Sequence, residues 1–285
     1  MAILSIQSHV AYGHVGNAAA VLPLQRLGYD VWPIHTVMFS NHTGYGSWRG
    51  PVISAGDVTA VIEGISERGV LHQCQAVLSG YMGNTALGEV IIDAVTRVRT
   101  ANPKAIYLCD PVMGDVGRGV FVKSDIPEFM RKYAIPAADI ITPNQFELEL
   151  LTNQKIETLE DALAAAKMAR RLGPKVILIT SLIRRETAED SIEMLAASDK
   201  GSWLISTPRF KLTPPPNGAG DATSALFLAY YLAQNSLSKA LAKAAASVFA
   251  LFEATDHAGS RELALIAAQD RIVRPRTKFI PRRVS

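Results

Sequence analysis

Short apolar runs alternate with longer segments of helical periodicity over the first two thirds of the chain. The strand-like runs lie at 3–7, 31–39, 76–79, 105–109, 140–142 and 176–180. The segments with helical periodicity lie at 16–27, 86–100, 147–151 and 158–172. Near-continuous apolar strands separated by amphipathic helices are typical of a parallel sheet that is covered on both faces. We therefore predict an α/β fold with a central, mostly parallel sheet flanked by helices on both faces.

The last third of the chain has a different pattern. The runs 191–198 and 202–207 flank Asp199-Lys200-Gly201, a sequence typical of a hairpin turn, which predicts antiparallel strands at the edge of the sheet. After three consecutive prolines at 214–216, the chain becomes rich in Ala and Leu. The helices that we expect there lie at 221–234, 237–254 and 261–272. Because neither an internal repeat nor a long polar linker interrupts these patterns, we predict one domain over residues 1–285.

The composition fits a globular protein with a sizeable core, since 48% of the residues are hydrophobic and 19% are charged. The formal net charge of +3 comes largely from basic residues after position 270. No aromatic interleaving or DNA-binding motif accompanies these residues, so we expect a solvated terminus and no nucleic-acid partner.

The cysteines and the apolar runs bear on where the protein works. Cys74 and Cys109 are too few for a disulfide framework, and their spacing fits no zinc site. The first residues lack the features of a secretion signal, and no apolar run reaches the ~18 residues of a membrane span. We therefore expect a soluble, cytoplasmic protein without a membrane partner.

Polar residues gather where the predicted parallel strands end. Ser8 follows the first strand and Asp110 the fourth, while Thr142 and Thr180 close the fifth and sixth. In open α/β sheets, ligands bind beyond the carboxyl ends of the strands. We therefore expect the active site at this edge of the sheet.

The segment Gly218-Ala219-Gly220-Asp221 stands at the start of a predicted helix. Glycines let a ligand approach the backbone, and the free amides of a first helical turn favour negative charge, so a phosphate in transfer would be stabilised there. Asp221 beside those amides would accept the proton of an attacking hydroxyl. The alternative is a tight turn in which Asp221 caps the helix. The segment alone favours neither interpretation.

Two further acidic residues shift the balance toward catalysis. Asp110 follows a strand, and Glu147 closes the sequence Asn144-Gln145-Phe146-Glu147. Mg²⁺ takes oxygen ligands and keeps several waters, so one or two carboxylates near phosphates suffice to hold it. Taken singly, Asp110 has the alternative of a turn residue, and Glu147 that of a first-turn acid favoured by the helix dipole. Together the three acids favour a phosphate site, with Asp110 and Glu147 holding Mg²⁺ directly or through water.

The chain contains neither a P-loop motif nor the signature set of protein kinases. Residues 114–119 include three glycines, but not at the spacing of a dinucleotide-binding loop. We predict a mobile lid over 114–124, with an ordinary long surface loop as the alternative.

Two polar segments follow the first two predicted strands. Residues 8–17 and 40–46 carry hydroxyls and imidazoles flanked by aromatic residues, a composition that suits a planar heteroaromatic substrate. The histidines lack a metal-binding spacing, and we expect them to make structural hydrogen bonds. For Ser8 and Thr43, substrate binding and loop capping both stay open.

These motifs resemble those of the ribokinase-like superfamily and, within it, of the pyridoxal kinases. The resemblance spans most of the chain. The length of the chain, without a long extra segment, resembles that of the bacterial salvage-type enzymes. The landmarks are Ser5-Ile6-Gln7-Ser8-His9-Val10, Phe39-Ser40-Asn41-His42-Thr43-Gly44-Tyr45, Cys109-Asp110-Pro111-Val112-Met113-Gly114-Asp115, Ile141-Thr142-Pro143-Asn144-Gln145-Phe146-Glu147 and Gly218-Ala219-Gly220-Asp221. The last two are shared with other superfamily kinases, whereas the first two are much more specific to pyridoxal kinases.

The resemblance implies a homodimer that uses ATP and Mg²⁺ to phosphorylate the 5′-hydroxyl of pyridoxal. It implies that Asp221 is the catalytic base and that the amides of Gly218, Ala219 and Gly220 form the anion hole. The residues that it implies for the pyridoxal pocket are Ser8 on the pyridine ring, Thr43, Gly44, Val15 and Tyr81. The residues that it implies for ATP and its metal are Asp110, Thr142, Glu147, Thr180, Thr207, Pro208, Arg209 and Phe210.

Some bacterial members carry Gln where this chain has Gly44, which leaves the preference among pyridoxal, pyridoxine and pyridoxamine open. A rival enzyme is hydroxymethylpyrimidine kinase, which shares the superfamily site and also phosphorylates a hydroxymethyl group on a heteroaromatic ring. A rival from another class is a catalytically silent sensor of a vitamer or nucleotide. The loops at Ser8 and Thr43 favour pyridoxal, and the acids at Asp110, Glu147 and Asp221 argue against a sensor.

Overall fold

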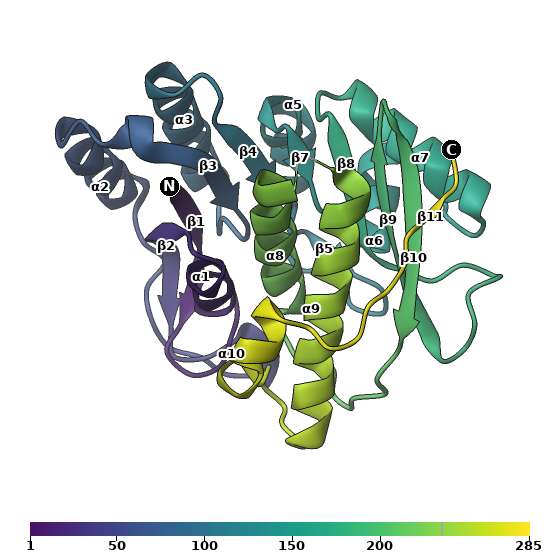
Figure 1. Cartoon of the computed structure of the whole chain (residues 1–285). Helices are drawn as coiled ribbons and strands as arrows, with labels where there is room; N and C mark the ends of the chain where they lie inside the picture. Colours follow the sequence, from purple (N-terminus) through teal and green to yellow (C-terminus); the bar gives the residue numbers. More distant parts are fainter. Residues whose placement is uncertain (235) are drawn as a thin grey trace.

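Nine strands form one sheet in the computed structural model, which describes residues 1–234 and 236–285 (Figure 1). Six neighbouring strands, in the order β8-β7-β4-β3-β1-β2, run parallel. Their bounds are β1 Ala2–Val10, β2 Asp30–Phe39, β3 Cys74–Ser79, β4 Ile106–Cys109, β7 Ile140–Ile141 and β8 Val176–Leu182. The prediction of a mostly parallel sheet is confirmed.

The other edge of the sheet is antiparallel, as the hairpin turn predicts. Strand β9 (Ser191–Ser198) pairs antiparallel with β8, β10 (Gly201–Pro208) with β9, and β11 (Arg282–Arg283) with β10. Two reversals give β10 the same direction as β8. The end of β10 therefore lies at the edge where the parallel strands end.

Helices cover both faces of the sheet, which confirms the predicted layers. The helices on one face are α1 (Asn17–Arg26), α8 (Ala219–Gln234), α9 (Leu237–His257) and α10 (Leu265–Val273), of which α8, α9 and α10 lie in front of the sheet in Figure 1. The helices on the other face are α2 (Ala55–Glu67), α3 (Thr85–Ala101), α4 (Ile126–Phe129), α5 (Ile135–Ala137), α6 (Gln145–Thr152) and α7 (Leu159–Arg171).

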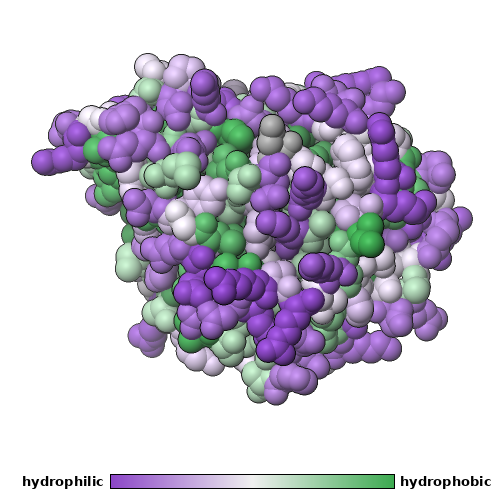
Figure 2. All heavy atoms as spheres, in the orientation of Figure 1, coloured by the Kyte–Doolittle hydropathy of each residue, from purple (hydrophilic) through white to green (hydrophobic). Residues whose placement is uncertain are grey.

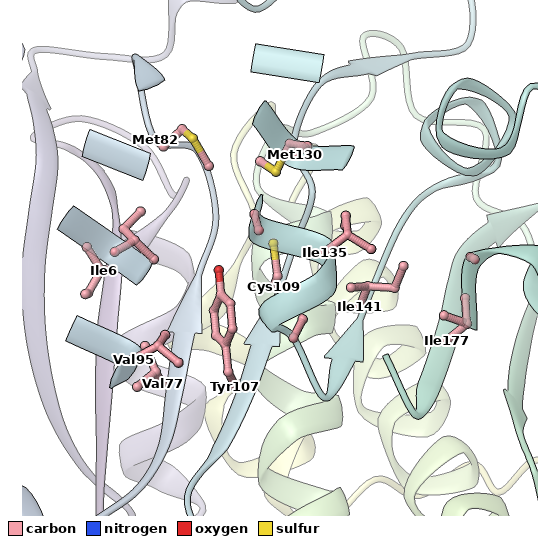
Figure 3. Packing of buried hydrophobic residues seen from close by; sticks show 14 of the residues in the cluster. Ile6, Val77, Met82, Val95, Tyr107, Cys109, Met130, Ile135, Ile141 and Ile177 are labelled. Carbon is pink, nitrogen blue, oxygen red and sulfur yellow. The ribbon is translucent and has the colours of Figure 1, made fainter. Parts of the chain in front are cut away.

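Each face has its own apolar core because successive strand residues point to opposite sides. Ile3 and Leu108 pack under α8 and α9, whereas Ile6, Val77 and Tyr107 pack toward α3 and its neighbours, as Figure 3 shows for the second group. The parallel strands thus have apolar residues buried on both faces of the sheet.

Several elements differ from the sequence-based expectations. Helices α2, α4 and α5 were not predicted, α8 begins two residues early at Ala219, and α10 begins at Leu265 instead of at position 261. Strand β1 runs on to Val10, so Ser8 lies within it and not after it, and β8 runs on past Thr180 to Leu182, because the pairing with neighbouring strands continues beyond the apolar runs. Residues 261–264 are held outside the helix because the amide of Ala264 donates to Thr255 Oγ1 and the Ser260 hydroxyl donates to the Glu262 carbonyl.

The glycine-rich segment after β4 folds partly into a hairpin. Strands β5 (Gly114–Asp115) and β6 (Gly119–Val120) pair antiparallel and form a separate two-stranded sheet. The hairpin occupies the first half of the predicted lid, 114–124. Whether the segment closes over a ligand stays a prediction.

Across the described parts of the chain, 1–234 and 236–285, no helix has both the length and the apolar character that a bilayer crossing requires. Helix α9 has 21 residues and carries Lys239, Lys243, Glu253 and Asp256. On the face shown in Figure 2, hydrophobic residues appear as separate patches among hydrophilic ones.

Candidate active site

The glycine turn before α8 is packed tightly against the N-terminal loop. Gly218 has φ 83°, and a Cβ built there would lie 1.8 Å from the carbonyl oxygen of His14. Only glycine satisfies both the left-handed backbone and this contact. The first bond along the helix runs from the Ala222 amide to the Gly218 carbonyl at 3.0 Å, so the preceding amides have no acceptor within the helix. They form a positively polarised N-terminus suited to an anion.

The Asp221 carboxylate is held by the N-terminal loop. Its Oδ2 accepts a hydrogen bond from the Gly16 amide at 2.8 Å, across 205 positions of sequence. Helix α8 begins at Ala219, two residues before Asp221, so Asp221 does not stand at the N-cap position. The alternative interpretation, in which Asp221 caps its own helix, is wrong for this reason. Burial raises the pKa of Asp221 to about 6, against the lowering effect of the Gly16 hydrogen bond. A carboxylate with such a pKa is suited to accept a proton near neutral pH.

Gly16 also contacts Ser8, the residue predicted to bind a substrate ring. Gly16 has φ 56°, and a Cβ there would lie 2.1 Å from the Ser8 carbonyl oxygen and 2.4 Å from Ser8 Oγ. An isolated antiparallel bridge between His9 and Gly16 closes the loop. The structure therefore brings Ser8 and Asp221, far apart in sequence, to the same glycine.

Asp110 is joined to α8 by the hydroxyl of Ser224, which also contacts the hydroxyl of Thr142. Its Oδ2 accepts from Ser224 Oγ at 3.1 Å, and Ser224 Oγ lies 2.8 Å from Thr142 Oγ1. Asp110 and Thr142 are 5% and 1% exposed, so this network is screened from water. A Cβ on Gly220 would lie 3.9 Å from Asp110 Oδ2, which places Asp110 beside the first turn of α8.

Glu147 has a structural role that is visible in its hydrogen bonds. Its Oε1 accepts from the Met113 amide at 2.9 Å, and its Oε2 accepts from the Asn144 amide at 3.0 Å. The Asn144 side chain accepts in turn from the Glu147 amide, which completes a capping box at the start of α6. Glu147 thus ties the loop after β4 to α6, and both of its oxygens already accept backbone amides.

The acids at this edge lie in surroundings that disfavour their charged forms. Burial, followed by repulsion from Glu147 and Asp221, raises the pKa of Asp110 well above its ordinary range. Burial also raises the pKa of Glu147, although backbone hydrogen bonds oppose the shift. A cation would relieve this repulsion. Within residues 1–234 and 236–285 no cluster of three His, Cys, Asp or Glu side chains forms a metal cage. One or two carboxylates in an oxygen-rich site fit Mg²⁺, which keeps most of its waters.

The two predicted substrate loops lie against each other. Thr43 and Gly44 belong to a short 3-10 helix, Thr43–Tyr45, and are exposed. The loop that carries them contacts the N-terminal loop, because the amides of Ala11 and Tyr12 donate to the carbonyls of Phe39 and Ser40 at 2.9 Å.

Val15 and Tyr81 also lie at this end of the sheet. Val15 is buried, and its Cα lies 3.2 Å from the position of a Cβ on Gly218. Tyr81 follows β3, and its carbonyl accepts from Thr36 Oγ1 at 2.8 Å. Of the residues predicted for the ring pocket, Val15 contacts the glycine turn and Ser8 reaches Asp221 through Gly16, whereas Tyr81 lies at the end of β3 beside Thr36.

The residues predicted for the nucleotide extend along the edge toward β10. The Thr180 amide donates to the Pro143 carbonyl at 3.1 Å, which sets the end of β8 beside the Thr142 segment. Thr207 and Pro208 end β10, and the Arg209 amide donates to the Asp190 carbonyl at 2.7 Å. Phe210 packs on α9, with ring centroids 5.3 Å from Phe249 and 6.4 Å from Phe252. In the sheet, strands β9, β8 and β7 lie between β10, which carries Thr207 and Pro208, and β4, which Asp110 follows.

Three residues at this edge escaped the sequence-based prediction of the site: Gly16, Ser224 and Glu262. The Glu262 carboxylate accepts from the His14 amide at 2.9 Å and from the Tyr45 hydroxyl. Ser224 and Glu262 have partners 114 and 248 positions away, so no local pattern marks them. For Gly16, the density of polar residues around it was the available signal.

Comparison with known sequences identifies relatives of this chain. A sequence model of the family described as Phosphomethylpyrimidine kinase matches residues 54–264. The pyridoxal kinase of Rubrobacter xylanophilus is 60% identical over 284 residues, 99% of this chain and 97% of that protein. The pyridoxal kinase of Deinococcus radiodurans is 55% identical over 286 residues, 99% of this chain and 96% of that protein.

Solved structures give the same result. The pyridoxal kinase from Leishmania donovani in complex with ADP and pyridoxamine has a TM-score of 0.92 at 30% identity, and the match covers 100% of this chain and 99% of that one. The full-length matches include the N-terminal loops that the family model, starting at residue 54, leaves out. The chain therefore belongs to the family described as Phosphomethylpyrimidine kinase and, over its full length, to the pyridoxal kinases.

Proposed function

We propose that this chain transfers the γ-phosphoryl group of ATP to the 5′-hydroxyl of pyridoxal and so forms pyridoxal 5′-phosphate. The observation that carries the proposal is the position of Gly16, which bonds to Asp221 at 2.8 Å and contacts Ser8. A pyridine ring bonded to Ser8 would present its hydroxymethyl group to Asp221. Pyridoxal kinases at 60% and 55% identity support the acceptor, and the ADP complex of the Leishmania donovani protein supports the nucleotide.

Asp221 acts as the general base in this proposal. Its carboxylate takes the proton of the 5′-hydroxyl while that oxygen attacks the γ-phosphorus in line, and the bond from the γ-phosphorus to the β-phosphate oxygen breaks to release ADP. The amides of Gly218, Ala219 and Gly220 stabilise the charge on the transferring group, since they stand free at the start of α8.

Two sets of residues bind the substrates. Ser8 bonds the pyridine ring, Thr43 and Gly44 line the same pocket, and Val15 and Tyr81 pack against the ring. The set for ATP is Asp110, Thr142, Glu147, Thr180, Thr207, Pro208, Arg209 and Phe210. Segment 114–124 acts as the lid that excludes water.

Mg²⁺ would be held at the Asp110 end of the nucleotide site. Asp110 would bind it directly or through water, whereas Glu147 would act through water, because both Glu147 oxygens accept backbone amides. When bound, the ion supplies positive charge to the phosphates. Burial, followed by repulsion from Glu147 and Asp221, raises the pKa of Asp110, and a cation at this place would offset both effects.

Hydroxymethylpyrimidine kinase activity is the second candidate, because the family model that matches residues 54–264 is described by a phosphomethylpyrimidine kinase. Its acceptor is also a hydroxymethyl group on a heteroaromatic ring, so Asp221 and the glycine turn would serve both reactions. The residues that separate the two candidates lie outside the matched segment, at Ser8 and Thr43.

A coupled assay of ATP consumption tests both candidates with pyridoxal, pyridoxine, pyridoxamine and the pyrimidine alcohol. We expect turnover with pyridoxal. Asp221→Asn keeps an acceptor for the Gly16 amide but loses the base, so we expect a similar KM for pyridoxal and a kcat about 10²–10⁴-fold lower. A kcat near that of the wild type would refute Asp221 as the base, and turnover confined to the pyrimidine alcohol would refute the acceptor.

A further inference from the structure

Glu262 joins two loops that belong to the proposed pyridoxal pocket. It lies between α9 and α10, far from both loops in sequence. Its Oε2 accepts from the His14 amide at 2.9 Å, and its Oε1 accepts from the Tyr45 hydroxyl. One carboxylate thus holds the N-terminal loop with one oxygen and the loop that contains Thr43 and Gly44 with the other.

The preceding residue strengthens the contact with the second loop. The Arg261 guanidinium carbon lies 3.7 Å from the centroid of the Tyr45 ring, and Nη2 donates to the Gly44 carbonyl at 3.4 Å. A guanidinium over an aromatic face is attracted by the ring quadrupole. Desolvation and the hydrogen bond to Glu262 raise the pKa of Tyr45 to about 12, so its hydroxyl stays a donor at neutral pH.

Segment 13–16, which Glu262 contacts, also packs against the glycine turn that precedes Asp221. The His14 carbonyl packs on Gly218, and the Gly16 amide bonds to Asp221. On the other side, a Cβ on Gly13 would lie 2.4 Å from Glu262 Oε2, so the loop is in close contact with the carboxylate. Only one residue separates His14 from Gly16, and a shift of His14 therefore changes the position of the amide that orients Asp221.

We propose that Glu262 is a positioning residue that holds segment 13–16 and Tyr45 together, and thereby fixes Asp221 relative to the ring of the bound B6 vitamer. The inference rests on the proposed function. It predicts two effects that kinetics can separate. Loss of the Tyr45 bond weakens binding of the vitamer, whereas loss of the His14 bond also slows turnover through Asp221. Neither effect extends to ATP, because neither of the two loops held by Glu262 contains a residue of the proposed ATP set.

Four variants test this arrangement. Glu262→Ala removes both bonds, and Glu262→Gln restores them without the charge, because the amide oxygen accepts from His14 while the amide nitrogen donates to the Tyr45 oxygen. Tyr45→Phe removes the second bond alone. Glu253→Ala is the matched control, since its carboxylate bonds to Arg271 at 2.6 Å between α9 and α10, apart from the proposed site.

For Glu262→Ala we expect a kcat with pyridoxal at least about tenfold lower, a higher KM for pyridoxal and an unchanged KM for ATP. Glu262→Gln should recover most of the kcat. Tyr45→Phe should raise the KM for pyridoxal while its kcat stays within about twofold of the wild type, and Glu253→Ala should leave all three constants unchanged. Thermal unfolding of each variant identifies the assay temperature at which all are folded.

Equal kinetic constants for Glu262→Ala and Glu253→Ala would overturn the inference, as would a Glu262→Gln variant as slow as Glu262→Ala. Either result can occur only if the wild type turns over pyridoxal. A wild type without such turnover would instead refute the proposed function, so the two failures are distinguishable.

Discussion

Replacing Gly218 with Ala would show how much the proposed catalysis depends on the contact between the glycine turn and the N-terminal loop. The new Cβ would lie 1.8 Å from the His14 carbonyl oxygen, whereas ordinary van der Waals contact begins at 3.4 Å. Either the start of α8 or segment 13–16 must therefore move by more than 1 Å. Both carry groups of the proposed mechanism, the free amides of α8 on one side and the Gly16 bond to Asp221 on the other.

The expected loss of stability and of kcat can be worked out from the backbone conformation and from the displacement. A left-handed conformation costs a residue other than glycine about 1–2 kcal/mol, which lowers the free energy of unfolding. A displacement of about 1 Å in a catalytic constellation costs about 10²-fold in rate. We therefore expect Gly218→Ala to lower kcat with pyridoxal by about 100-fold and to lower the stability by at least the cost of the backbone conformation.

The variant Gly28→Ala separates the cost of the left-handed backbone from the effect of the steric contact with His14. Gly28 has φ 90°, close to the value of Gly218, but a Cβ there would meet no atom within 4 Å. The Gly28→Ala control should lose about 1–2 kcal/mol of stability, the cost of the left-handed conformation, and keep the kcat of the wild type. The measurements are kcat and the KM for both substrates, together with denaturant unfolding. If the two alanine variants had the same kcat, the reasoning about the turn would be refuted.

Two further predictions concern the buried acids. Because burial raises the pKa of Asp221 to about 6 in the free enzyme, the base is protonated below that pH, and kcat/KM for pyridoxal should fall as the pH drops through about 6; a kcat/KM that stays constant down to pH 5 would contradict this. Asp110→Asn should lower ATP-dependent turnover but raise the unfolding temperature without ligands at pH 8, since burial and the neighbouring Glu147 and Asp221 make the ionised form of Asp110 costly in the folded state. The sign follows from the raised pKa: the cost develops as the pH rises from 3.8, the ordinary value, so the difference between variant and wild type should shrink toward pH 4.

Much of the fold follows from local patterns in the sequence. The alternation of apolar runs and amphipathic segments predicts the parallel strands, and Asp199-Lys200-Gly201 predicts the hairpin of β9 and β10, because both depend on neighbouring residues only. Helix α2 had a local signal as well: the Ser54 side chain caps it by accepting from the Asp57 amide, and Val58 and Ile62 are its buried residues. The start of α10 had none, since Thr255 and Ser260 decide it through side-chain hydrogen bonds.

The residues of the candidate site likewise fall into those that local sequence patterns predict and those that only tertiary contacts bring together. The sequence by itself placed Asp110 after β4 and the glycine turn at the start of α8, because the end of an apolar run and the first turn of a helix are local properties. It placed Ser8 after the first strand, whereas Ser8 lies within β1. Only the tertiary structure decided that Gly16 contacts both Ser8 and Asp221, that Ser224 bonds to Asp110, and that Glu262 joins His14 to Tyr45. Except for the contact of Gly16 with the nearby Ser8, each of these contacts joins residues more than 100 positions apart, and packing of helices on the sheet, not any local pattern, sets which of them meet.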